Sequence, residues 1–127
     1  MRACWAVVAL LLTSCGERII FPVDGAWLRG GISGDHSGII VMLLKQDGNN
    51  ITGSACRTSS GHLIYRDTPV TGRYPRVGFQ VLGCQFEGGI TSTDQLVGSN
   101  TCNDTTQQWF FQRASPSDYN ACVNASP

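Results

Sequence analysis

The sequence has little charge and no excess of either sign. Nine Lys and Arg residues, of which Lys45 is the single lysine, stand against nine Asp and Glu residues in 127, so the formal net charge is zero. Nucleic acids and anionic lipid surfaces attract proteins through an excess of positive charge. We therefore expect no nucleic-acid partner, and any membrane attachment must come from something other than a basic surface.

Metal-binding and catalytic patterns are also missing. The two histidines, His36 and His62, are far in sequence from every cysteine, and no Cys-x-x-Cys or Cys-x-x-His pair occurs, which argues against a zinc site. The glycine-rich stretch 30–38 lacks the Gly-Lys-Ser/Thr ending of a phosphate-binding loop. His62, Asp67 and the serines at 54, 59 and 60 allow a hydrolytic triad to be sketched, but no Gly-x-Ser-x-Gly motif surrounds a serine. We expect no enzyme, no metal and no cofactor.

No apolar run is long enough to span a bilayer as a helix, which takes ~20 residues. The longest run, Cys4 to Leu12, follows Arg2 and precedes Thr13 and Ser14. A basic start, a short apolar stretch and small residues are typical of an export signal, here residues 1–14. An ordinary secretory signal with a chance cysteine behind it, or a simple N-terminal anchor, stays open as an alternative.

The end of this segment, Leu12-Thr13-Ser14-Cys15, resembles the lipobox of bacterial lipoproteins. The resemblance implies cleavage before Cys15, lipidation of Cys15, and a lipidated tether over residues 15–23. Several acyl chains anchor a protein stably, so the membrane would be a partner through the lipid anchor. Gly16 is not the aspartate associated with inner-membrane retention. The resemblance thus places the protein in the bacterial cell envelope, with the outer membrane favoured if the host has one.

Four of the six cysteines are left for the mature domain if Cys4 leaves with the signal and Cys15 carries lipid. An even set in an exported chain predicts disulfides, here among Cys56, Cys84, Cys102 and Cys122. A hairpin with its turn near residue 93 would bring Cys84 opposite Cys102 and leave Cys56 for Cys122. The competing pairing joins Cys56 to Cys84 and Cys102 to Cys122, closes two local loops, and stays open.

Residues 24–114 read as about eight short strands with turn residues between them and no convincing helix. Asp47-Gly48 between two β-rich runs indicates a hairpin. We predict an all-β antiparallel meander, closed or nearly closed as a small disulfide-stapled barrel, with a sandwich as the alternative. The expected strands cover 26–29, 39–44, 51–55, 62–65, 68–74 with a break at Pro69, 76–81, 84–90, 96–102 and 107–113, and a loop covers 57–61.

The run Ile39 to Leu44 is apolar without alternation. A strand with one face in water should alternate, so both faces of this strand are expected to be covered. Three candidates could cover the outer face: residues 19–21, a partner protein, or the Ser/Asn/Pro-rich C-terminal tail 115–127, which Cys122 alone ties down.

The strands also share sequence features with a known group of barrels. The features are Gly25 and Trp27, Ile51-Thr52-Gly53, Phe86 and Gly88, Leu96 and Gly98, and Trp109, Phe111 and Arg113. This pattern resembles small calycin-type barrels, the lipocalin-like and avidin-like group. The resemblance implies the barrel fold but no binding residue, because the tryptophans and polar groups that hold biotin in avidins have no counterpart here.

Four aromatic residues, Trp27, Phe79, Phe86 and Trp109, are candidates to line a cavity for a small apolar ligand; otherwise they are packed core. A mildly basic stretch, Arg57, Arg66, Arg73 and Arg76 beside Tyr65 and Tyr74, could meet an acidic partner at one side. The expected role is a lipid-anchored, non-enzymatic binding module. The alternatives are a protein-interaction or hydrolase-inhibitor lipoprotein that binds an envelope protein, or a purely structural surface protein. An internal cavity would favour the ligand binder, and a filled interior would favour the partner-binding protein.

Overall fold

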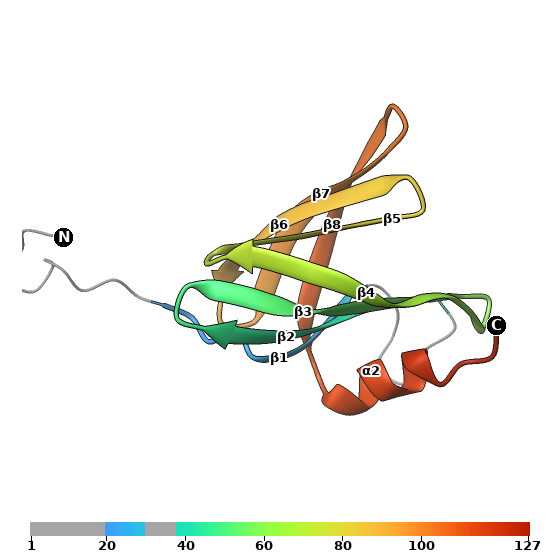
Figure 1. Cartoon of the computed structure of the whole chain (residues 1–127), viewed down its shortest axis with the longest axis horizontal. Helices are drawn as coiled ribbons and strands as arrows, with labels where there is room; N and C mark the ends of the chain where they lie inside the picture. The colour runs from blue at the N-terminus through green and yellow to red at the C-terminus, as the bar shows by residue number, and fades with distance from the viewer. Residues whose placement is uncertain (1–19, 30–37) are drawn as a thin grey trace, which may run out of the picture.

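Eight antiparallel strands form a closed barrel in which each strand pairs with its neighbours in sequence and β1 also pairs with β8 (Figure 1). The computed structural model describes residues 20–29 and 38–127. The all-β antiparallel meander is confirmed, and it is closed as a barrel. Its strands are β1 (Gly25–Arg29), β2 (Ile40–Asp47), β3 (Asn50–Ser59), β4 (His62–Arg73), β5 (Arg76–Val81), β6 (Cys84–Ser92), β7 (Gln95–Cys102) and β8 (Thr105–Ala114).

The two ends of the barrel differ, and we name them by the arginines that lie there. At the Arg113 end the described chain begins, and the β2–β3, β4–β5 and β6–β7 turns lie there. At the Arg29 end β1 finishes, and the turns at 60–61, 82–83 and 103–104 join the other strand pairs. In Figure 1 the Arg113 end lies on the left, where the N-terminal segment enters. The predicted signal 1–14, Cys15 and His36 lie outside the described residues.

Tight turns set the register of the strands. The β2–β3 turn contains Gly48 at φ +64°, and Asp47 pairs with Asn50, so the hairpin predicted from Asp47-Gly48 is confirmed. The β5–β6 turn places Leu82 and Gly83 at φ 52° and 77°. Two central residues with positive φ match the right-handed twist of the flanking strands.

Side chains from all eight strands fill the interior as one apolar cluster. Phe86 lies at its centre, fully buried, with its ring against the glycine pair Gly88 and Gly98. A Cβ on Gly98 would lie 2.8 Å from the Phe86 ring and 2.3 Å from the Glu87 carbonyl oxygen. The glycines therefore make the space that this phenylalanine occupies.

One helix, α2 (Pro116–Val123), lies in the tail, where the sequence predicted none. Ser115 caps it, with Pro116 in the first turn and Asp118 completing the capping box. The helix packs against the outer face of β1 to β4, where Tyr119 and Cys122 join Ile39 and Val41 in a second buried cluster. Of the three candidates for covering the outer face of the apolar strand, the C-terminal tail is therefore the one that lies there. Within the described ranges no helix is long and apolar enough to cross a membrane.

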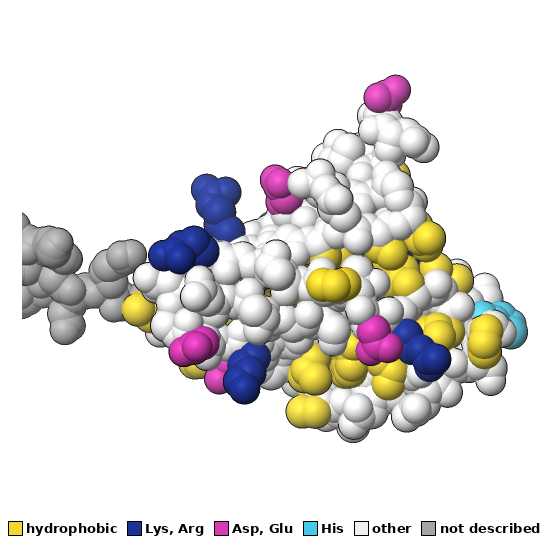
Figure 2. Space-filling model, viewed as in Figure 1, with side chains coloured by type: hydrophobic (Ala, Val, Ile, Leu, Met, Phe, Trp, Pro, Cys, Tyr) yellow, Lys and Arg dark blue, Asp and Glu magenta, His cyan; other side chains and the backbone are white. Residues whose placement is uncertain are grey.

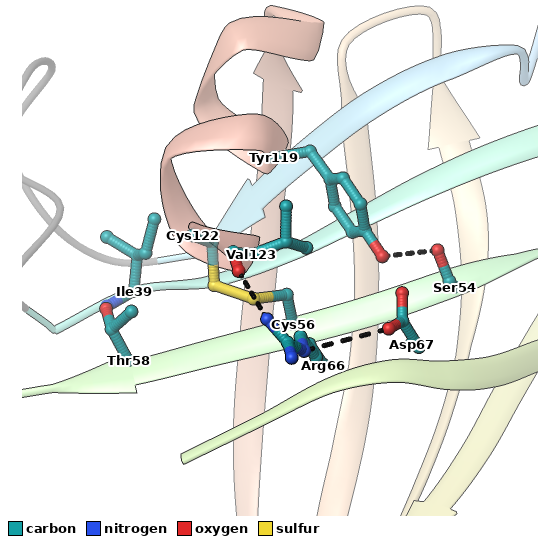
Figure 3. Close-up of a disulfide and its surroundings, with 9 residues drawn as sticks. All are labelled: Ile39, Ser54, Cys56, Thr58, Arg66, Asp67, Tyr119, Cys122 and Val123. Carbon is teal, nitrogen blue, oxygen red and sulfur yellow. Dashed lines mark hydrogen bonds and ion pairs between the residues drawn. A yellow bond between two sulfur atoms is a disulfide. The ribbon is translucent and has the colours of Figure 1, made fainter. Parts of the chain in front are cut away.

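Both disulfides follow the first of the two pairings. Cys84 faces Cys102 across β6 and β7 with a Cα–Cα distance of 4.2 Å, and the pairs Ile90 with Leu96 and Gly88 with Gly98 have the expected register. Cys56 on β3 bonds Cys122 on α2 (Figure 3). Beside it the Tyr119 and Ser54 hydroxyls are 2.5 Å apart, and Arg66 donates to the Val123 carbonyl at 3.0 Å. The tail is therefore tied by a helix cap, hydrogen bonds and packing as well as by Cys122.

The β3–β4 hairpin differs from the prediction. The expected loop at 57–61 is confirmed only at 60–61, because β3 continues to Ser59, and the break at Pro69 is wrong because β4 continues through it. The irregularities lie elsewhere: Arg66 and Asp67, the latter at φ 55°, stand opposite Cys56, and Ile64 is an extra residue before Tyr65. These two bulges turn Tyr65 toward the barrel interior, next to Arg57.

Candidate functional site

The four aromatic residues expected to line a cavity form parts of the packed interior. Phe79, Phe86 and Trp109 contact one another, with the Phe86 centroid 5.4 Å from Phe79 and 5.7 Å from Trp109. Trp27 lies near the other end of the barrel, and none of the four is more than 6% exposed. These positions match the packed-core alternative, which shifts attention to the barrel ends and its outer surface.

The Arg113 end is held by hydrogen bonds. The Arg113 guanidinium lies over the Trp27 ring, 4.1 Å from its centroid, and donates to the carbonyls of Pro22, Val23, Asp24 and Thr93. The Trp27 indole donates to the Val23 carbonyl at 3.0 Å. Gly25, Trp27 and Arg113, three residues of the calycin-like pattern, thus meet here. The Arg113 guanidinium and the Trp27 indole both have backbone acceptors, so these residues close this end of the barrel.

The Arg29 end carries a second arginine–tryptophan pair. The Arg29 guanidinium lies 4.7 Å from the Trp109 ring centroid. Trp109 is only 4% exposed, and its Nε1–H has no hydrogen-bond partner among the described residues. Buried polar groups are rarely left unpaired, so this donor marks a place of interest.

Arg57 and Tyr65 join Arg29 in one cross-strand row. Arg29 pairs with Ile40, Ile40 with Arg57, and Arg57 with Tyr65, on the neighbouring strands β1 to β4. The Ile40 side chain belongs to the interior cluster, so its row partners also face inward. Burial lowers the pKa of Arg29, and the charge of Arg57 lowers it further. Burial raises the pKa of Tyr65 to about 12, against the opposite effect of the two arginines.

The predicted basic stretch does not form one surface. Arg57 and Tyr65 face inward at the Arg29 end, whereas Arg73, Tyr74 and Arg76 lie at the Arg113 end. On the face in Figure 2, Lys and Arg side chains gather toward the end where the chain enters, and hydrophobic side chains gather around α2 and toward the Arg29 end. Arg29, which the sequence analysis did not single out, completes the inward group.

The outer surface has an open groove of about 1010 Å³ over β4 to β7. The groove lies beside the junction of β4 and β5. These two strands are paired in register at Thr71 and Gly78 and diverge away from that pair. Gly78 and Gly89 line the groove and have no side chains to fill it. A row of hydrogen-bonded polar side chains crosses it, in which Gln80 donates to Gln85 and Gln85 donates to Glu87 at 2.8 Å.

The sketched triad does not assemble. The Ser54 hydroxyl contacts Tyr119, and Asp67 forms an ion pair with Arg66 at 3.8 Å, so neither is directed to His62. In the part of the chain that the structure describes, no three His, Cys, Asp or Glu residues cluster as metal ligands do. The inward arginine row is the group that sequence reasoning missed, since only the strand register brings Arg29 to Arg57.

Comparisons of this chain with protein-family models, with curated proteins and with solved structures found no match.

Proposed function

We propose that this chain is a lipid-anchored, non-enzymatic binding module of the bacterial cell envelope with a calycin-like barrel. The lipobox Leu12-Thr13-Ser14-Cys15 and the signal 1–14 support the anchor. The two disulfides support an oxidising compartment outside the cytoplasm, because such bonds persist there.

One observation carries the binding role: the interior is filled, and the large concavity lies outside, in the groove over β4 to β7. Trp27, Phe79, Phe86 and Trp109 are buried in the interior cluster, and Phe79 and Phe86 also border the groove. The groove, with amides, a carboxylate and Arg76 along it, suits an extended segment of an envelope protein that is rich in polar groups. A hydrolase-inhibitor role would use the same surface.

The anchor is tested by the mass of the protein extracted from membranes. We expect the mass of the chain from Cys15 onward plus a diacylglycerol group and an acyl chain, and we expect the Cys15→Ala variant to lack the lipid. A cleaved protein without lipid would contradict the anchor and favour free secretion.

The groove is tested by a photo-crosslinking residue at Gln85 in living cells, with Gln112 on β8 as the matched control. Both side chains are exposed glutamines on strands, and Gln112 does not line the groove. We expect one discrete cross-linked protein from position 85 and none from position 112. Equal, diffuse products from both positions would contradict a binding role for the groove.

A further inference from the structure

The Arg29 end contains a group of hydrogen-bond donors that face inward and have no acceptor among residues 20–29 and 38–127. Arg29, Arg57 and Tyr65 come from β1, β3 and β4 in one cross-strand row around Ile40. Strands in a sheet lie about 4.8 Å apart, so the backbones of the two arginines are about 10 Å apart, within reach of both long side chains. Trp109 of β8 faces them beneath the Arg29 guanidinium.

The positive charge of this group is not neutralised by a carboxylate among residues 20–29 and 38–127. The ion pair formed within these ranges joins Arg66 to Asp67, and neither Arg29 nor Arg57 takes part in it. Two like charges that are partly buried repel each other and lose hydration, and an anion between them relieves both effects. The pKa of Arg29 is lowered by its burial and by Arg57, which agrees with this geometry.

The Arg113 end provides an internal comparison. Both ends have an arginine over a tryptophan, at 4.1 and 4.7 Å. At the Arg113 end, backbone carbonyls accept from both the guanidinium and the indole. At the Arg29 end, no described residue accepts a hydrogen bond from the Trp109 indole, and the Arg29 guanidinium forms no hydrogen bond with a described residue but lies over the Trp109 ring. Within the described residues, the Arg29–Trp109 pair therefore has the same kinds of donor as the Arg113–Trp27 pair but lacks the carbonyl acceptors.

The chemistry of the missing acceptor follows from the donors. Guanidinium groups bind the two oxygens of a carboxylate or phosphate in a forked geometry. The Tyr65 phenol keeps its proton at neutral pH because its pKa is about 12, so it is a further donor. The indole N–H is a donor only.

We propose that the Arg29 end of the barrel binds a small oxyanion, a carboxylate or phosphate group, through Arg29, Arg57, Tyr65 and the Trp109 indole. This site is separate from the outer groove, because its side chains face the interior of the barrel. The Tyr65 ring contacts Phe79, with centroids 6.4 Å apart, so packed aromatic rings lie below the proposed anion.

The test is a titration of nitrogen-labelled full-length protein, purified from membranes in detergent, with sodium phosphate, with sodium acetate and with phosphatidylglycerol vesicles. Sodium chloride at equal ionic strength is the reference. The readout is the Trp109 indole N–H signal, assigned with Trp109→Phe. We expect a saturable shift of this signal, while the Trp27 signal stays in place. The vesicle titration distinguishes a lipid headgroup from a free anion as the source of the oxyanion.

Variants assign the site to its residues. We expect Arg57→Gln and Arg29→Gln each to weaken binding by at least about tenfold, as loss of one partner from a desolvated charge pair does. Arg76→Gln, which removes an exposed arginine at the opposite end, should leave binding unchanged.

A second readout does not depend on any variant. Phosphate should raise the thermal midpoint of the wild-type protein more than chloride does, because a ligand of the native state stabilises it. The proposal is overturned if the Trp109 indole signal does not move with any probe. It is also overturned if folded Arg29→Gln and Arg57→Gln proteins bind as the wild type does. Neither result bears on the cross-links from Gln85, so the groove and the anion site fail independently.

Discussion

Arginine lies over tryptophan at both ends of the barrel, and the surroundings of each guanidinium determine its role. Arg113 closes its end through backbone carbonyls of the N-terminal segment and of Thr93. The Arg29 side chain contacts a ring but no carbonyl of the described residues, and Arg57 lies in the same row. The surroundings of Arg113 stabilise the fold, whereas those of Arg29 leave donors available to the proposed oxyanion.

This difference predicts that the same substitution has a large effect on stability at one arginine and a small effect at the other. Arg113→Gln should lower the free energy of unfolding by about 2–3 kcal/mol, because hydrogen bonds to a charged group and a stacking contact are lost. Arg29→Gln should change it by no more than about 0.5 kcal/mol, or raise it, because a like-charge repulsion is removed. Urea denaturation of both variants measures the effects, and an equally large loss in both would argue that Arg29 is structural.

Tyr65 gives a pH dependence with a definite sign. Its pKa is raised by burial to about 12 in the folded protein, whereas an unfolded tyrosine has a pKa of about 10. The native state holds the phenolic proton more tightly, so this contribution to stability is complete below about pH 10 and is lost between about pH 10 and 12. Phenolate absorbance should show a component near the upper value that Tyr65→Phe removes. Its absence from the wild type would place Tyr65 in water.

At the scale of elements, β7 depends on its glycine. Gly98→Ala would bring a Cβ to 2.5 Å from the Gly88 Cα and to 2.8 Å from the Phe86 ring. We expect a loss of about 1–3 kcal/mol, the usual cost of overpacking. Gly38→Ala is the control, because its Cβ would meet no atom within 4 Å. Calorimetric melting of both variants tests this prediction. Equal midpoints would mean that β6, β7 and Phe86 shift enough to accommodate the added methyl group without loss of stability.

Helix α2 depends on its N-cap. Ser115→Ala removes the oxygen that accepts from the Ser117 N–H and should cost about 1 kcal/mol. Asn120→Ala, at an exposed position within the helix, should be neutral or slightly stabilising. Hydrogen exchange over residues 116–123 would report the fraying directly. Unchanged exchange in Ser115→Ala would mean that the disulfide and Tyr119 alone hold the helix.

The elements differ in how far the sequence predicts them. The β6–β7 hairpin follows from its turn region: Ser92 pairs with Gln95 around Thr93 and Asp94, and a one-residue register shift between Ile90 and Ser92 then brings Cys84 opposite Cys102. The helix has a local signal, Ser115-Pro116 with Asp118, but its eight residues are too few for a periodic pattern. The bulges around Cys56, where the β3–β4 register shifts, have no such local signal. Arg29 and Arg57 come together through the β1–β2 and β2–β3 registers, and Tyr65 joins them through the β3–β4 bulges, so the row could not be predicted from residues alone.

At the scale of the whole molecule, the two ends of the barrel have different relations to the proposed anchor. The described chain begins at Ile20 and crosses the Arg113 end before β1, where Phe21 donates to the Tyr74 hydroxyl at 2.9 Å. Only a few residues separate Ile20 from Cys15. A lipid on Cys15 would therefore hold the Arg113 end near the membrane and direct the Arg29 end away from it, toward ligands in solution.

The orientation can be measured on the lipidated protein in nanodiscs whose lipids carry paramagnetic headgroups. Paramagnetic broadening falls steeply with distance, so we expect the amide signals of the Arg113-end turns at 48–49 and 93–94 to broaden strongly. The signals of the Arg29-end turns at 82–83 and 103–104 should stay sharp, because the barrel lies between them and the membrane. The Cys15→Ala protein, mixed with the same nanodiscs, is the control and should show no broadening at either end.

Stronger broadening at the Arg29 end would mean that this end faces the bilayer. A bound oxyanion would then have to come from the membrane side, which the phosphatidylglycerol titration would reveal as binding to vesicles but not to free phosphate.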